Sequence, residues 1–92
     1  MVEGDEVRVW LVERTYSDDE QNIIITTYAT LDGERYYRQE RAITSFGQAD
    51  EGTPISRIVS EANLGDVEPG RKEQYRMEAQ RMADKHDPDD KL

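Results

Sequence analysis

The sequence predicts a single α+β domain in which a three-stranded antiparallel meander is followed by two helices. Three observations support this fold class. The first 45 residues are rich in β-branched and aromatic side chains, an Asp-Gly pair divides them, and helical apolar spacing begins only after residue 53. The chain has 92 residues, enough for one ordinary domain. We expect one domain over 1–92, with flexible tails at 1–6 and 87–92.

The strands are expected at residues 7–16, 22–31 and 34–45. Asp32-Gly33 is a strong hairpin signal between the last two. A type I turn with Gly33 in a bulge sets Tyr28 opposite Tyr36, and a slip of one residue there moves third-strand side chains to the other face.

The first helix is expected to start at Thr53 and Pro54, which suit the cap and the first helical position. Its apolar stripe is Ile55, Ile58, Val59 and Ala62. The second helix is expected from about Pro69 to His86, with a stripe at helical spacing formed by Tyr75, Ala79, Met82, Ala83 and His86.

Alternation along the strands sorts the meander into two faces. The face expected to form the core carries compact aliphatic side chains: Val7, Val9, Leu11, Ile23, Ile25, Ala29, Tyr37 and Ile43. The other face mixes aromatic rings with guanidinium groups, and its candidate partner-binding residues are Trp10, Tyr28, Tyr36, Arg14 and Arg38. Three such rings expose about 500 Å², near the upper end of the largest patch on a typical monomer. Something is therefore expected to cover this face.

Three coverings stay open: one of the chain's own helices, a second copy of the chain, or a peptide or single-stranded nucleic acid. Tyr, Trp and Arg are enriched in protein interfaces, and sheet aromatics also stack on exposed bases. A small-molecule regulator site at the junction of sheet and helix is a weaker alternative. We expect a small protein–protein interaction module, a homodimer or a binder of another protein, with a single-stranded nucleic-acid binder as the alternative.

The composition limits these classes further. Twenty-one acidic residues outnumber twelve basic ones, for a net charge of −9, which disfavours nucleic acid because phosphate binding needs a positive field. There is no cysteine, no signal-peptide pattern and no stretch long enough to span a membrane, so we expect a cytoplasmic protein. Many acidic residues with three lysines resemble proteins of salt-loving archaea. The segments "VRVWLVERTYSDDEQNIII" and "DGERYY" also resemble small uncharacterised proteins of that group, a resemblance that covers about half the chain and implies no activity.

No catalytic or cofactor signature is present in the sequence, so we expect no enzyme activity, no cofactor and no metal. The one histidine, His86, stands beside Asp87 near a helix end, where a cation compensates the helix dipole. The acidic run Asp18-Asp19-Glu20 lacks the spacing of a calcium loop and is expected to be a solvated turn.

Overall fold

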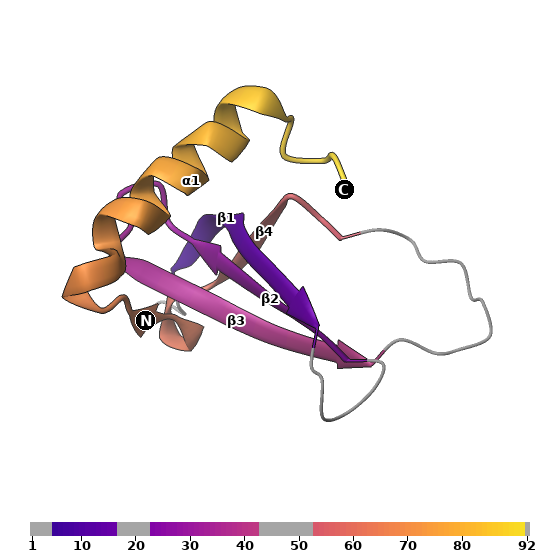
Figure 1. Ribbon diagram of the computed structural model, residues 1–92, viewed down its shortest axis with the longest axis horizontal. Coiled ribbons are helices and arrows are strands. Elements are labelled where there is room, and N and C mark those ends of the chain that lie inside the picture. The colour runs from indigo at the N-terminus through magenta and orange to yellow at the C-terminus, as the bar shows by residue number, and fades with distance from the viewer. Residues whose placement is uncertain (1–4, 17–22, 43–52, 92) are drawn as a thin grey trace.

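An antiparallel sheet with one helix laid across it forms the part of the chain that the computed structural model describes, residues 5–16, 23–42 and 53–91 (Figure 1). The elements in chain order are β1 (Glu6–Tyr16), β2 (Ile23–Ala29), β3 (Arg35–Ala42), β4 (Ser56–Ser60), the 3₁₀ turn η1 (Glu61–Asn63), β5 (Gly65–Asp66), the 3₁₀ turn η2 (Pro69–Arg71) and α1 (Lys72–Lys85). The order of the five strands across the sheet is β4-β1-β2-β3-β5. Expectations for residues 1–4, 22, 43–45 and 92, and for the turn at Asp18-Asp19-Glu20, lie outside the described residues.

The predicted fold class is wrong, because the segment expected to form the first helix is a strand. In β4, Val59 pairs with Val7 and Arg57 pairs with Val9 of β1. Unpaired strand edges offer backbone partners along their whole length, and β-branched Ile58 and Val59 suit a strand. Pairing with β1 therefore overrides the helical spacing. The fold is a five-stranded sheet with one C-terminal α-helix, which starts after η2, close to the predicted second helix.

The hairpin between β2 and β3 forms at Asp32-Gly33 as predicted, but its register is shifted by one residue. Gly33 has a φ of 73°, the left-handed conformation that favours glycine. Tyr28 faces Tyr37 rather than Tyr36, and Tyr36 faces Ala29. The loop is longer than predicted because Asp32 accepts hydrogen bonds within it, from the Thr30 hydroxyl at 2.6 Å and the Glu34 amide at 2.9 Å.

The two faces of the sheet consequently hold different residues from those predicted. The helix face presents Trp10, Ala29 and Tyr36 toward α1, with Val12 placed there by a bulge in β1. The far face presents a second cluster: Val9, Leu11, Tyr28 and Val59, flanked by Val7, Tyr37 and Leu64. The predicted grouping of Ala29 with Val9 and Leu11 is therefore wrong, and both faces contribute to the core.

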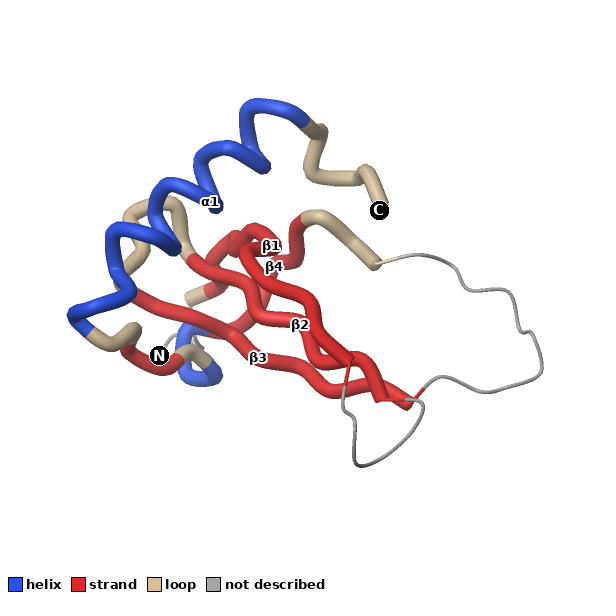
Figure 2. Tube along the Cα trace, in the orientation of Figure 1, coloured by secondary structure: helices blue, strands red, loops and turns tan. Residues whose placement is uncertain are grey.

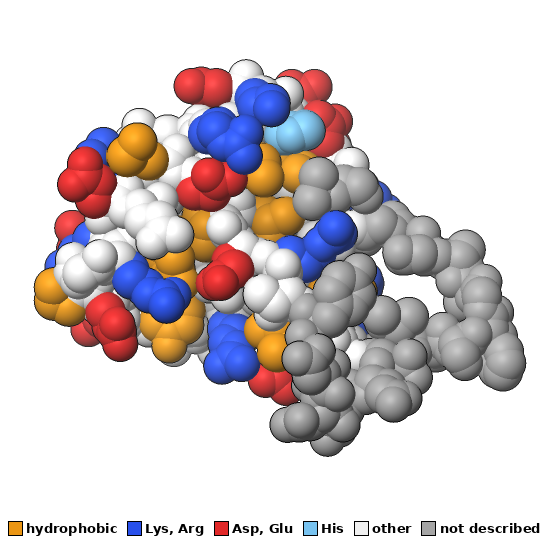
Figure 3. All heavy atoms as spheres, in the orientation of Figure 1, with side chains coloured by type: hydrophobic (Ala, Val, Ile, Leu, Met, Phe, Trp, Pro, Cys, Tyr) orange, Lys and Arg blue, Asp and Glu red, His pale blue; other side chains and the backbone are white. Residues whose placement is uncertain are grey.

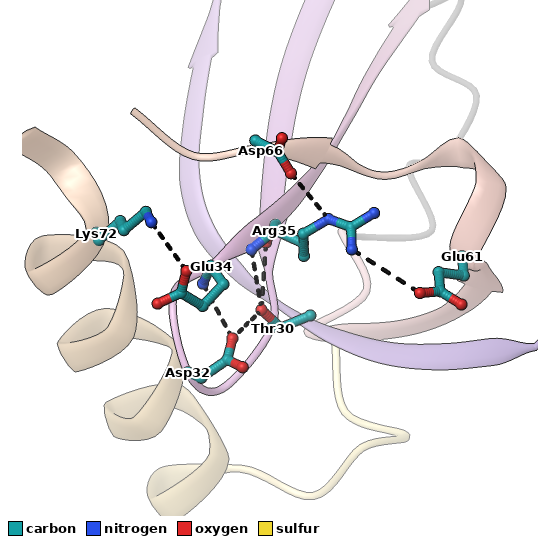
Figure 4. A network of polar contacts seen from close by, with 7 residues as sticks. All are labelled: Thr30, Asp32, Glu34, Arg35, Glu61, Asp66 and Lys72. Atoms are coloured by element: carbon teal, nitrogen blue, oxygen red, sulfur yellow. Dashed lines mark hydrogen bonds and ion pairs between the residues drawn. The ribbon is translucent and has the colours of Figure 1, made fainter. Parts of the chain in front are cut away.

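The sheet curls so that its two edge strands approach each other. Edge strands of a flat five-stranded sheet lie about 19 Å apart, whereas a 3₁₀ turn rises only about 2 Å per residue. The short link Glu61–Leu64 nevertheless joins β4 to β5. At the closed end, Arg35 of β3 lies 3.8 Å from the Glu61 carboxylate and 3.2 Å from that of Asp66 (Figure 4).

Helix α1 buries Tyr75 and Ala79 against the helix face. An ion pair of 2.9 Å between Lys72 and Glu34 joins its first turn to the hairpin loop (Figure 4). After α1 the chain runs back toward the start of β4 (Figure 2). There the Ile55 amide donates to the Asp90 carbonyl at 3.0 Å. The C-terminal segment, expected to be a flexible tail, is thus hydrogen-bonded in its described part to the chain that leads into β4. Within the described residues, no helix has the length and apolar character needed to cross a membrane.

Candidate functional site

The five predicted partner-binding residues do not share one surface. Trp10 is 6% exposed and packs against Ile55 and Ala79 beneath α1. Tyr28 is 1% exposed on the far face, where its hydroxyl donates to the Pro54 carbonyl at 2.9 Å. The chain's own helix thus covers Trp10, as in the first of the three coverings considered, whereas the segment that leads into β4, which is not a helix, lies against Tyr28.

Arg14 also lies on the far face, opposite Thr26 of β2. Its guanidinium donates to the Thr53 hydroxyl at 3.2 Å. Thr53, expected to cap a helix, instead accepts this bond and so helps to hold the chain that enters β4.

Tyr36 and Arg38 remain together on the helix face. They line an open groove of about 560 Å³ where the sheet extends past the start of α1. The strands contribute Glu13, Thr15, Ile25, Thr27, Tyr36 and Arg38, and the segment from β5 to α1 contributes Asp66, Val67, Glu68, Arg71 and Tyr75. Arg71 and Tyr75 were not predicted as site residues, because sequence spacing does not reveal that η2 meets the sheet here.

The groove carries both signs of charge. The Arg71 guanidinium donates to the Tyr75 hydroxyl at 3.2 Å. That bond, together with the negative charges of Glu13 and Glu68, raises the pKa of Arg71 above its usual value. Arg38 lies 3.5 Å from the Glu40 carboxylate. On the face shown in Figure 3, basic and acidic side chains likewise alternate around small hydrophobic areas. The groove therefore suits a ligand with mixed polar character rather than a strong anion.

The β5 backbone fixes the position of the Tyr36 ring. A Cβ atom added to Gly65 would lie 2.7 Å from the Tyr36 ring, so only glycine lets the strand pass this close. Val67 then follows with 4% of its surface exposed and packs with Ala29 and Tyr75. Tyr36 thus lies half-buried at the end of the groove, next to the edge of β3.

Strand β3 leaves most of its outer edge unpaired by described residues. Residues Tyr36–Ala42 pair with β2 on one side, whereas β5 pairs only with Arg35 and Tyr36 on the other. The Gln39 carbonyl points toward β2, where it accepts from the Thr26 hydroxyl at 3.4 Å. Because backbone groups alternate along an antiparallel strand, the amide and carbonyl groups of Arg38 and Glu40 point outward. This stretch is a template for one more strand.

The comparison with protein families gives one result. The model of a "Family of unknown function (DUF7967)" matches residues 3–92. The chain belongs to this family. Searches of the curated proteins and of the solved structures gave no match.

Other candidate chemistry in this DUF7967 member is sparse among the described residues. No group of three or more His, Cys, Asp or Glu side chains is placed to hold a metal ion there. The His86 Nδ1 lies 3.4 Å from the Asp90 carboxylate, rather than pairing with the adjacent Asp87. The alternating charges of "YRQER" are a sequence signal that β3 lies at the edge of a sheet. The strand β5, which covers only the start of this edge, has two residues and is too short to predict from a sequence pattern.

Proposed function

We propose that the chain is a small, non-enzymatic, cytoplasmic protein-interaction module that self-associates by pairing the β3 edges of two copies. The outer edge of β3, which no described residue pairs beyond Tyr36, carries this proposal. Two antiparallel β3 strands related by a two-fold axis form one continuous sheet across the dimer, and a two-fold interface is the default for identical subunits. The absence of cysteine and the acidic composition are the basis for proposing the cytoplasm.

The direction of the backbone groups selects a register centred on Gln39. In that register Arg38 of one copy faces Glu40 of the second copy, and Glu40 faces Arg38. Both residues direct their backbone amides and carbonyls outward, so each such pair exchanges two hydrogen bonds. A longer pairing would bring the second copy to Tyr36, where Gly65 of β5 already lies. The ladder is therefore short.

The side chains complement each other in the same register. Arg38 and Glu40 are exposed and lie on the same face of β3, 3.5 Å apart within one copy. In the dimer each meets its opposite charge across the strands, and opposite-charge cross-strand pairs contribute about 0.2–1 kcal/mol each. The two grooves then adjoin the same interface, with Tyr36 near its ends.

The groove alone is a weaker candidate for self-association. A concave surface does not complement its own copy across a two-fold axis, whereas a strand edge does. The net charge of −9 still disfavours a nucleic-acid ligand and opposes dimerisation at low salt. Since the interface is small, we expect a weak dimer whose population rises with concentration and with salt.

A charge-swap experiment tests the register. Arg38→Glu places Glu opposite Glu40, and Glu40→Arg places Arg opposite Arg38. Each change replaces two attractive pairs with two repulsive ones, an effect of about 1–4 kcal/mol or at least about fivefold in the dissociation constant. The double variant restores both attractive pairs. Sedimentation equilibrium up to about 1 mM protein in 0.1 M and 2 M KCl measures the dimer.

The net charge supplies an internal control. Arg38→Glu changes it from −9 to −11, and Glu40→Arg changes it to −7. If long-range repulsion alone governed association, the second variant would dimerise better than the parent. The β3-edge proposal instead predicts that both single variants weaken the dimer and that the double variant recovers it. A wild type that stays monomeric at about 1 mM in 2 M KCl would refute self-association.

A further inference from the structure

A second cavity lies on the far face, away from the groove and opposite α1. Its volume is about 170 Å³. Its lining comes from β2, β3, β4 with the residues that precede it, and the C-terminal segment: Ile24, Thr26, Tyr28, Gln39, Arg41, Thr53, Pro54, Arg57 and Lys91. We refer to it as the basic pocket, because Arg41, Arg57 and Lys91 are its charged residues and none of its described lining residues is acidic.

This concentration of positive charge is unusual in so acidic a chain. Of the twelve Arg and Lys side chains, eight make an ion pair or a side-chain hydrogen bond with another described residue: Arg8, Arg14, Arg35, Arg38, Arg71, Lys72, Arg76 and Arg81. Three of the remaining four line the basic pocket. The fourth, Lys85, lies at the end of α1 and outside it.

Arg57 is the most buried of the three cations. It pairs with Val9 in the ladder between β4 and β1. Its Nε is shielded from solvent and has no hydrogen-bond partner among the described residues. A buried donor on a charged group is destabilising while unpaired, so an acceptor that enters the pocket relieves this.

Arg41 and Arg57 line the basic pocket together with the buried Tyr28. Burial raises the pKa of Tyr28, and the positive charges of these two arginines partly oppose that rise. The hydroxyl itself is held by its bond to the Pro54 carbonyl. The third cation approaches from the C-terminal segment, where Lys91 forms a backbone bridge with Pro54. The backbone thus brings residues 41, 57 and 91 to one place before any ligand arrives.

The size of the pocket restricts what it can hold. Sites for drug-sized molecules measure about 300–1,000 Å³, well above the volume of this cavity. A tetrahedral oxyanion fits, and guanidinium groups match its oxygens with directed, charge-assisted hydrogen bonds. We propose that the basic pocket binds a phosphate dianion, either free phosphate or the terminal group of a small phosphomonoester, through Arg41, Arg57 and Lys91.

The overall negative charge of the protein does not prevent a phosphate from binding in the basic pocket. At 0.1 M salt the screening length is about 10 Å, so an anion inside the pocket interacts mainly with the cations that line it. The excess acidic residues act at longer range and slow the approach of anions. Affinity is therefore set locally, and removal of one lining cation should weaken it strongly.

Amide chemical shifts in ¹⁵N-labelled protein test the proposal, with inorganic phosphate and glycerol 3-phosphate titrated separately at constant ionic strength set by KCl. Saturable shifts are expected at Thr26, Arg41 and Arg57. Lys91→Gln and Arg41→Gln remove exposed cations and leave the half-buried Arg57 in place, so the fold is retained. Each should weaken phosphate binding at least about tenfold, as expected for the loss of one charge-assisted bond.

The matched control is Lys85→Gln, which also removes one positive charge but outside the pocket. It should leave the dissociation constant within about twofold of the parent. Saturation by both anions supports a phosphomonoester ligand, and saturation by inorganic phosphate alone supports the free ion. Shifts that grow linearly without saturation, or equal weakening by Lys85→Gln and Lys91→Gln, would overturn the proposal.

Discussion

Gly33 lies where the hairpin loop touches the first turn of α1, and its replacement by alanine should strongly destabilise the protein. Its φ of 73° costs a residue with a Cβ about 1–2 kcal/mol. The added Cβ would also lie 2.8 Å from the Arg76 backbone nitrogen and Cβ, and closer still to the Lys72 carbonyl oxygen. Such overpacking costs about 1–3 kcal/mol. The sum, about 2–5 kcal/mol, is a large part of the roughly 5–15 kcal/mol that holds a typical domain folded.

Thermal unfolding followed by circular dichroism measures this effect. Since 1 kcal/mol corresponds to about 4–8 °C for a domain of this size, Gly33→Ala should lower Tm by at least about 8 °C. Gly70→Ala is the matched control, because no described atom beyond the two neighbouring residues lies within 4 Å of the Cβ it adds. It should leave Tm unchanged or raise it slightly by restricting the unfolded chain. Equal melting temperatures for the two variants would refute the inferred contact between loop and helix.

Two further predictions concern charge. The Thr30 hydroxyl and the Glu34 amide hold the pKa of Asp32 below its usual value, so its contribution to stability is present above about pH 4 and is lost as the pH falls through the folded-state pKa. Urea unfolding should therefore show Asp32→Asn less stable than the parent at pH 6, with the difference vanishing in acid; a constant difference would contradict this. The net charge of −9 predicts that Tm rises with KCl between about 0.1 and 2 M, where the screening length falls from about 10 Å to under 3 Å. A flat or falling Tm would count against adaptation to salt.

Local signals in the sequence predicted the features that depend on neighbouring residues. The Asp32-Gly33 turn is an example, since the conformation of Gly33 is set within the loop. The helix that buries Tyr75 and Ala79 is another, because its apolar stripe repeats over about three turns. Both features needed no knowledge of distant partners.

The predictions that were wrong concern features that depend on residues distant in the sequence or on a one-residue difference in strand register. Ile55, Ile58 and Val59 fit a helix as well as a strand, and the free edge of β1 decided between them. The one-residue error in the hairpin loop accompanied the exchange of Tyr28 and Ala29 between the predicted faces, whereas Tyr36 stayed on the face of Trp10 and Tyr37 on the face of Val9. Once β4 is known to be a strand, alternation with Ile58 places Arg57 and Val59 on the same face, and this is the signal that would have drawn attention to the basic pocket.

The long separation between β1 and the elements that cover it has a consequence for synthesis on the ribosome. The chain from residue 43 to Lys85 must still be made after β3 is complete, which takes about 2–9 s at 5–20 residues per second. A hairpin closes in microseconds. The nascent meander therefore waits for seconds with Trp10 and the outer edge of β1 uncovered. The charged residues spaced along that strand, Glu6, Arg8, Glu13 and Arg14, are suited to discourage aggregation during this interval.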